Sequence, residues 1–187
     1  MTKQIGFKIL FFGKHKGGYS LKTNIVLVGL YDKMIKSVAK RLADDFDMYL
    51  ADLMEIVKYN LINEEEIEKI CGVQYLNKQK TKIVEDIANY ENSVIHVPYS
   101  IFVEGGNPDK FQKNGTTVFL NLTLSTFKKL LDKDKTMSND EKKLALIVFN
   151  DRSSFSKRMC DLTVEIDSPD YLTAYRKVKK TLDNFLL

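Results

Sequence analysis

The chain has 187 residues, of which 44% are apolar and 29% charged, which predicts one soluble globular domain with a full hydrophobic core. The formal charge of +4 is small, and lysines alternate with acidic residues along the expected helices, so neither nucleic acid nor a membrane is an expected partner. The two cysteines, Cys71 and Cys160, make neither a disulfide framework nor a metal site. We interpret both as small core residues of a cytoplasmic protein.

Residues 1–20 are expected to form an N-terminal extension, with an extra strand as one interpretation. The apolar run 5–12 is too short to span a bilayer and is not followed by the cleavage site of a targeting signal. A single domain is expected over 21–187.

Apolar runs separated by helical patterns predict an α/β domain. The expected strands are 25–28, 48–50, 94–97, 117–120 and 162–166, and the first of them reads as a strand buried on both faces. Two helix-start signals lie between the strands, Asn63 with Glu66 and Ser138 with Glu141. Asn107 is expected to cap a short helix that has Pro108 at its first position. The run 144–149 alone would suit a strand equally well. The alternation predicts a parallel sheet with helices on both faces; the expected inward helix positions include Tyr75, Leu172 and Phe185.

The turn after the first strand is the expected ligand site, because ligands of such sheets bind beyond the carboxyl ends of the strands. A phosphate-binding loop there reads GxxxxGK[ST]. Its backbone N–H groups surround the phosphates, its lysine neutralises them and its hydroxyl holds Mg²⁺. Segment 29–43 of this chain reads GLYDKMIKSVAKRLA.

This segment resembles, without a gap, the GxxGSGKSTVGKxLA segment of shikimate kinases. The resemblance pairs Gly29 with the first glycine and Ser37 with the second hydroxyl residue. It also puts Met34 at a loop glycine and Ile35 at the phosphate lysine, and Asp32 falls where another glycine is usual. Losing the lysine removes a charge-assisted contact worth roughly 1.5–3 kcal/mol.

The resemblance continues over about 24–185 and implies further site residues. Asn77 stands at a substrate-binding arginine, and Pro98-Tyr99-Ser100 stand at a glycine loop. Asp52 alone survives from a DxD motif that supplies the catalytic carboxylate, and it is out of register by one residue. Arg152 retains the arginine that grips the substrate carboxylate, with a structural salt bridge as the alternative.

Several of these residues allow two interpretations. Lys33 and Lys36 flank the vacant lysine position, and each either replaces that lysine or is simply solvated. Tyr99 is either an aromatic cover over an altered pocket or filler, and His96 suits a satisfied core histidine better than a catalytic one. The polar segment 132–140 corresponds to the family's closing lid and is expected to be the most mobile internal segment.

By the resemblance the fold is a three-layer α/β/α domain of the P-loop kinase type, with a five-stranded parallel sheet in the order 2-3-1-4-5. Fold-forming positions match, whereas most ligand-contacting positions differ. The leading hypothesis is a shikimate-kinase-like protein without effective kinase activity, which binds a small carboxylate-bearing ligand or a protein partner and needs no cofactor or metal. One alternative is an active shikimate kinase of aromatic amino-acid biosynthesis that uses MgATP and a non-standard nucleotide site of Gly29, Lys33, Lys36 and Ser37. The other is an unrelated small-molecule binder on the same fold.

Overall fold

A single parallel sheet forms the centre of the computed structural model, which describes residues 11–15 and 18–186. Its spatial order is β4-β5-β3-β6-β7, which is the predicted 2-3-1-4-5 with the first expected strand in the middle. The strands are β3 (Asn24–Gly29), β4 (Tyr49–Asp52), β5 (Ser93–His96), β6 (Gly115–Leu122) and β7 (Leu162–Ile166).

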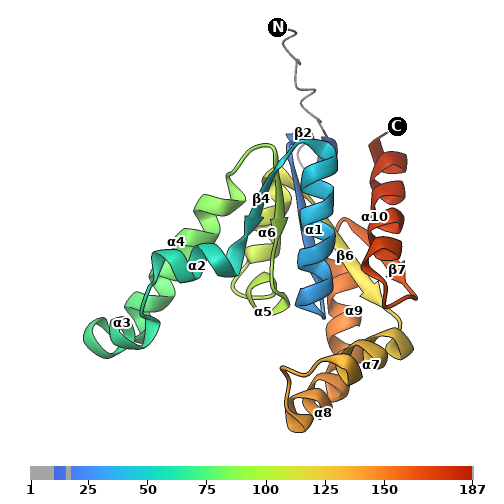
Figure 1. Cartoon of the computed structure of the whole chain (residues 1–187). Helices are drawn as coiled ribbons and strands as arrows, with labels where there is room; N and C mark the ends of the chain where they lie inside the picture. The colour runs from blue at the N-terminus through green and yellow to red at the C-terminus, as the bar shows by residue number, and fades with distance from the viewer. Residues whose placement is uncertain (1–10, 16–17, 187) are drawn as a thin grey trace, which may run out of the picture.

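Helices cover both faces of this sheet (Figure 1). On one face the core is closed by α1 (Asp32–Phe46), α7 (Leu124–Lys133), α9 (Phe149–Met159) and α10 (Tyr171–Leu186). On the other it is closed by α2 (Leu53–Asn60), α4 (Val73–Ala88), α5 (Tyr99–Phe102) and α6 (Asn107–Asn114). Alternate residues of β3 feed the two cores, with Ile25 and Leu27 on the α1 face and Val26 and Val28 on the other, as expected for a strand buried on both sides. None of the described helices has the length and apolar character needed to cross a membrane.

Part of the predicted N-terminal extension forms a separate antiparallel hairpin of β1 (Phe11–His15) and β2 (Gly18–Lys22). β2 crosses the predicted domain boundary at residue 21. At its end the buried Lys22 pairs with Asp161 at 2.9 Å, which ties the hairpin to the start of β7. The expectations for 1–10, 16–17 and 187 lie outside the described residues.

The run 144–149 is helical and does not join the sheet. Helix α8 (Asn139–Ile147) starts at the predicted Ser138–Glu141 capping box, in which each side chain bonds the other residue's backbone N–H. The predicted cap of α6 is wrong by one residue. Gly106 caps it in the left-handed conformation, and Asn107 lies inside the helix.

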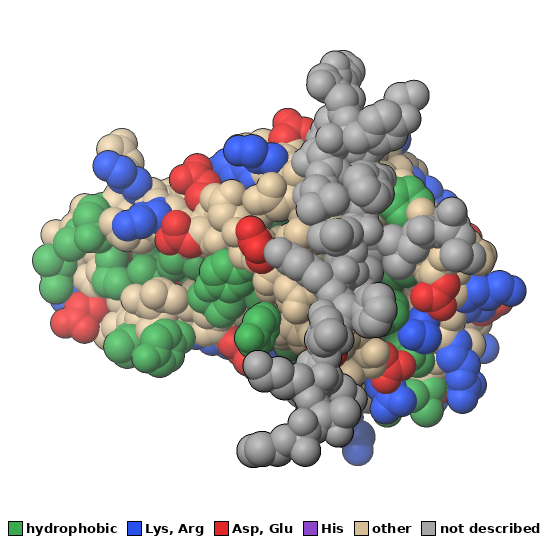
Figure 2. All heavy atoms as spheres, turned by 90° about the horizontal axis from the view of Figure 1, so that it is seen from above, with side chains coloured by type: hydrophobic (Ala, Val, Ile, Leu, Met, Phe, Trp, Pro, Cys, Tyr) green, Lys and Arg blue, Asp and Glu red, His purple; other side chains and the backbone are tan. Residues whose placement is uncertain are grey.

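Four predicted core positions are exposed. Cys71 ends α3 (Glu64–Cys71), a helix with no buried residue. Tyr75, Leu172 and Phe185 lie near the ends of their helices. Figure 2 shows hydrophobic side chains gathered at the end of the molecule formed by α2–α4, whereas charges of both signs are interspersed elsewhere on that face. The exposed apolar residues of this end are Tyr59, Ile62, Ile70, Val73 and Tyr75.

Candidate functional site

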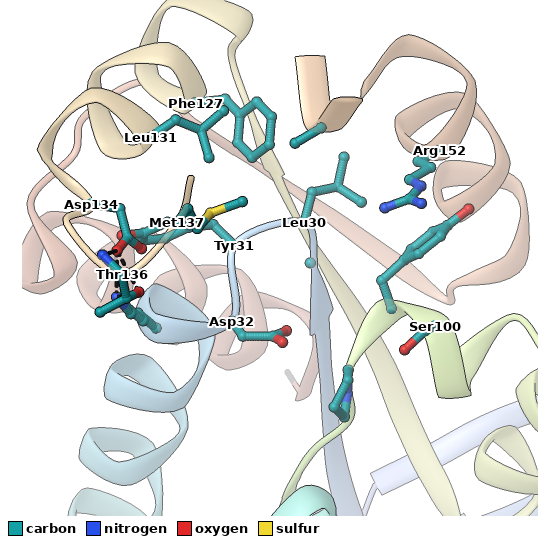
Figure 3. A pocket seen from close by; sticks show the side chains of 15 residues that line it. Leu30, Tyr31, Asp32, Ser100, Phe127, Leu131, Asp134, Thr136, Met137 and Arg152 are labelled. Carbon is teal, nitrogen blue, oxygen red and sulfur yellow. Dashed lines mark hydrogen bonds and ion pairs between the residues drawn. The ribbon is translucent and has the colours of Figure 1, made fainter. Parts of the chain in front are cut away.

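A cavity of about 310 Å³ opens where β3 and β5 end, at the edge predicted for ligands (Figure 3). One wall is the turn from β3 into α1. The others are the start of α5, helix α7 with the segment that follows it, and single residues of α8 and α9. The lining is therefore drawn from segments far apart in the sequence, and most of them were expected at the site.

The turn between β3 and α1 is short. β3 ends at Gly29 and α1 begins at Asp32, so two residues make the connection. The backbone N–H groups of Met34 and Ile35 both donate to the Tyr31 carbonyl, at 3.1 and 3.3 Å. By the resemblance these N–H groups belong to the phosphate-binding loop. Here they are instead hydrogen-bonded within the first turn of α1.

The side chains of Met34 and Ile35, which the resemblance aligns with a loop glycine and the phosphate lysine, are both buried in the core under α1. Neither side chain therefore fills the space beyond the end of β3. Ile35 packs against the strand, and a Cβ added at Gly29 would lie only 2.4 Å from its Cδ1 atom. The Ser37 hydroxyl donates to the Lys33 carbonyl at 2.8 Å, which is an intrahelical bond.

Lys33 is neutralised by a residue of the predicted lid. Its Nζ lies 2.7 Å from Asp134 Oδ1 and 2.7 Å from Thr136 Oγ1, and the Tyr31 hydroxyl donates to the same carboxylate at 3.0 Å. The bonds from Lys33 and then from Thr136 hold the pKa of Asp134 well below its usual range. Burial, followed by the bond to Asp134, raises the pKa of Tyr31 to about 12. Asp134 thus places a carboxylate of the protein itself beside the start of α1. The expected mobility of 132–140 stays a prediction.

Lys36 is also paired with carboxylates. Its Nζ lies 3.0 Å from Asp52 Oδ2 and also bonds Glu55. Those contacts, with Glu55 first, raise the pKa of Lys36. Lys33 and Lys36, the two candidates for the role of phosphate lysine, are therefore both ion-paired in this structure.

Asp52, the catalytic candidate, is buried at the end of β4, where it caps α2 by accepting the Glu55 N–H at 3.2 Å. His96 lies beside it on β5, with Nδ1 3.3 Å from Asp52 Oδ2. Burial alone would raise the pKa of Asp52, but the bonds from Lys36, Glu55 N–H and His96 outweigh it and lower the pKa. Asp52 is therefore held as an anion whose two oxygens already have donors.

Arg152 extends from α9 into the cavity (Figure 3), and its guanidinium lies over the Tyr99 ring, 5.1 Å from the centroid. Among the described residues, none forms an ion pair with it, so the salt-bridge interpretation finds no partner there. Asn77 does not share this cavity. It lines a neighbouring one of about 500 Å³ between α2, α4 and α6, and Ser100 lines both cavities.

Two features of the site were missed in the sequence. Asp134 has Thr136 as a local partner, but its partners Tyr31 and Lys33 lie about a hundred residues earlier in the chain, where no sequence pattern points to them. The single-turn helix α5 lies where the resemblance placed a glycine loop, although Pro98 immediately before it suits a helix start. His96 was expected to be satisfied, yet only its Nδ1 has a partner.

An all-parallel sheet in this order, with helices on both faces and a cavity beyond the strand ends, defines the chain as a domain of the P-loop kinase fold class. Residues 36–183 match the family model "Shikimate kinase". The chain therefore belongs to the shikimate kinase family. The matched segment begins at Lys36, within α1.

Individual relatives agree with this assignment. A shikimate kinase of Caldicellulosiruptor bescii is 27% identical over 149 residues, which is 77% of this chain and 86% of the relative. A shikimate kinase of Xylella fastidiosa is 25% identical over 158 residues, which is 81% of this chain and 88% of the relative. The solved shikimate kinase of Bacteroides thetaiotaomicron superposes with a TM-score of 0.70 at 17% identity, over 86% of this chain and 98% of that one.

Proposed function

We propose that this member of the shikimate kinase family binds a small carboxylate-bearing ligand in the cavity of Figure 3 and does not transfer phosphate from ATP. The observation that carries the proposal is the helical start of α1. Its N–H groups at Met34 and Ile35 are already bonded, and Lys33 and Lys36 are neutralised by carboxylates. The residues present therefore do not fit the phosphates of MgATP, which require free donors and an unpaired cation.

Arg152 supplies the positive end of the proposed ligand site. A guanidinium offers a planar fork that binds a carboxylate through two hydrogen bonds, and stacking on Tyr99 limits its orientations. With one such fork, a small monocarboxylate should bind at roughly millimolar affinity.

Titration of shikimate and of 3-phenylpropanoate into the Arg152→Ala variant tests this proposal. We expect at least a tenfold loss of affinity with a stability change within about 0.5 kcal/mol, because Arg152 is exposed. Arg158→Ala removes another exposed arginine of α9 and should leave binding unchanged. Unaltered binding in Arg152→Ala would sink the proposal, as would unfolding of that variant.

The second candidate function is an active shikimate kinase. It is supported by relatives that carry that name and match most of their own length, and by Asp52, held as an anion at the end of β4. In that case Lys33 would have to leave Asp134 or Lys36 leave Asp52. ATP turnover with shikimate present separates the two functions: steady ADP release by the wild type that Asp52→Asn abolishes would establish the kinase.

A further inference from the structure

The Asp134 carboxylate occupies a compact set of hydrogen-bond donors. Its Oδ1 accepts from Lys33 Nζ and Thr136 Oγ1, both at 2.7 Å, and from the Thr136 N–H at 2.9 Å, and its Oδ2 accepts from the Tyr31 hydroxyl at 3.0 Å. Only 2% of the Asp134 side chain is exposed. An ammonium, two hydroxyls and a backbone N–H together suit any small oxyanion and not only a carboxylate.

The two charges of this cluster are held by each other and not by their own helices. Lys33 lies in the first turn of α1, and Asp134 caps the C-terminal end of α7. A helix dipole disfavours a cation at the first of these positions and an anion at the second. Without Asp134, the positive charge of Lys33 would add to the positive end of α1, and both would attract an anion.

The donors border the cavity and not the core. Tyr31, Lys33, Asp134 and Thr136 all line the space of about 310 Å³, and the side chain of Lys33 is half exposed. In Figure 3 the cluster lies at one end of this space and Arg152 extends from the opposite side. A free anion that entered the cavity would therefore meet these donors if Asp134 did not already fill them.

We propose that the donors of Tyr31, Lys33 and Thr136 form a binding site for a small oxyanion of the phosphate class, and that Asp134 blocks this site by occupying it. Asp134 belongs to the same chain, so its effective concentration at the site exceeds that of a free anion. Asp134 is thus an autoinhibitory residue. A purely structural salt bridge would leave no affinity for phosphate once the carboxylate is removed. The blocked site is independent of Arg152 and of the ligand proposed above.

Calorimetric titration of inorganic phosphate into the full chain tests whether Asp134 blocks the site. Asp134→Ala keeps the backbone N–H that closes α7 on the Leu130 and Leu131 carbonyls, both at 3.1 Å, so the fold should persist. We expect this variant to bind phosphate at least tenfold more tightly than the wild type. Adding Lys33→Met should abolish the gain. Asp132→Ala, the matched control, removes an exposed carboxylate of the same segment and should bind phosphate no better than the wild type.

Acetylation of lysines by acetic anhydride, followed by mass spectrometry, locates the bound anion. Phosphate should slow the acetylation of Lys33 in Asp134→Ala but not in the wild type, relative to potassium chloride at equal ionic strength. Lys40, an exposed lysine further along α1, should react at the same rate in every case. Equal protection of Lys33 and Lys40 would contradict a site at Lys33.

Three results would overturn the assignment. One is a folded Asp134→Ala variant with the phosphate affinity of the wild type, and another is a gain that survives Lys33→Met. If Asp134→Ala does not fold, the isosteric Asp134→Asn replaces it and should still gain at least threefold, and no gain there would be equally decisive. The third is a gain that disappears when Arg152→Ala is added, because the anion would then lie at Arg152. That result would leave the proposed function standing.

Discussion

Substituting Gly29 tests whether the side chain of Ile35 occupies the space beside the strand. A Cβ at residue 29 would lie 2.4 Å from Ile35 Cδ1, 3.0 Å from its Cγ1 and 3.2 Å from the Leu120 carbonyl oxygen. Contacts this close force the core to shift, so Gly29→Ala should cost about 1–3 kcal/mol. Ile35→Val removes the Cδ1 atom and alone should cost about 0.5–1.5 kcal/mol.

The two changes should not add. When Ile35→Val is already present the closest contact is gone, so Gly29→Ala should then cost at least about 0.5 kcal/mol less than in the wild type. Urea denaturation of the four proteins, with equal m-values, measures this coupling. Gly115→Ala is the matched control, because its Cβ would meet Val26 and Phe111 instead, and its cost should add to that of Ile35→Val. Additivity of Gly29→Ala with Ile35→Val would refute the position assigned to Ile35.

Two further predictions concern the acidic residues around α1. The pKa of Asp52 is lowered in the folded state, so its contribution is present above the ordinary carboxyl pKa of about 4 and is lost as the pH falls through the lower folded value. Asp52→Asn should therefore lower the free energy of unfolding at pH 7 by about 1 kcal/mol, a small amount because Lys36 is half exposed and screened by solvent. The variant should also lose less stability than the wild type as the pH falls below about 4. An equal dependence of stability on pH in the two proteins over this acid range would contradict the prediction. Asp134→Ala removes the partner of Lys33, so trypsin should cut within 132–140 faster than in the wild type or in Asp132→Ala, whose aspartate is exposed. Identical cleavage rates in all three proteins would show that Asp134 does not hold this segment.

The sheet was predictable because its strands are apolar runs whose burial depends on local pattern. Ile25 to Val28 is continuous and β-branched, and it lies at the centre as expected. The sequence at the start of α1 carries two incompatible patterns. Met34 and Ile35 fit the helical spacing of Val38 and Leu42, whereas the family pattern treats the same positions as loop. The periodicity was the better guide, because burying two large apolar side chains stabilises the helical turn.

The polar contacts of the site could not be predicted in the same way. Asp134 meets Lys33, and His96 meets Asp52, only because the fold brings distant segments to one edge of the sheet. A polar residue in a sequence carries no periodic signal that identifies its partner. The separation of Asn77 from Arg152 into neighbouring cavities likewise depends on how α4 is placed.

Calorimetric titration of MgATP into the wild-type protein tests most directly whether the phosphate site is lost. With the N–H groups of Met34 and Ile35 bonded to Tyr31 and with Lys33 held by Asp134, we predict no saturable binding below roughly 1 mM, which corresponds to about −4 kcal/mol. MgADP should behave in the same way. A micromolar dissociation constant for MgATP, with or without shikimate, would contradict the account.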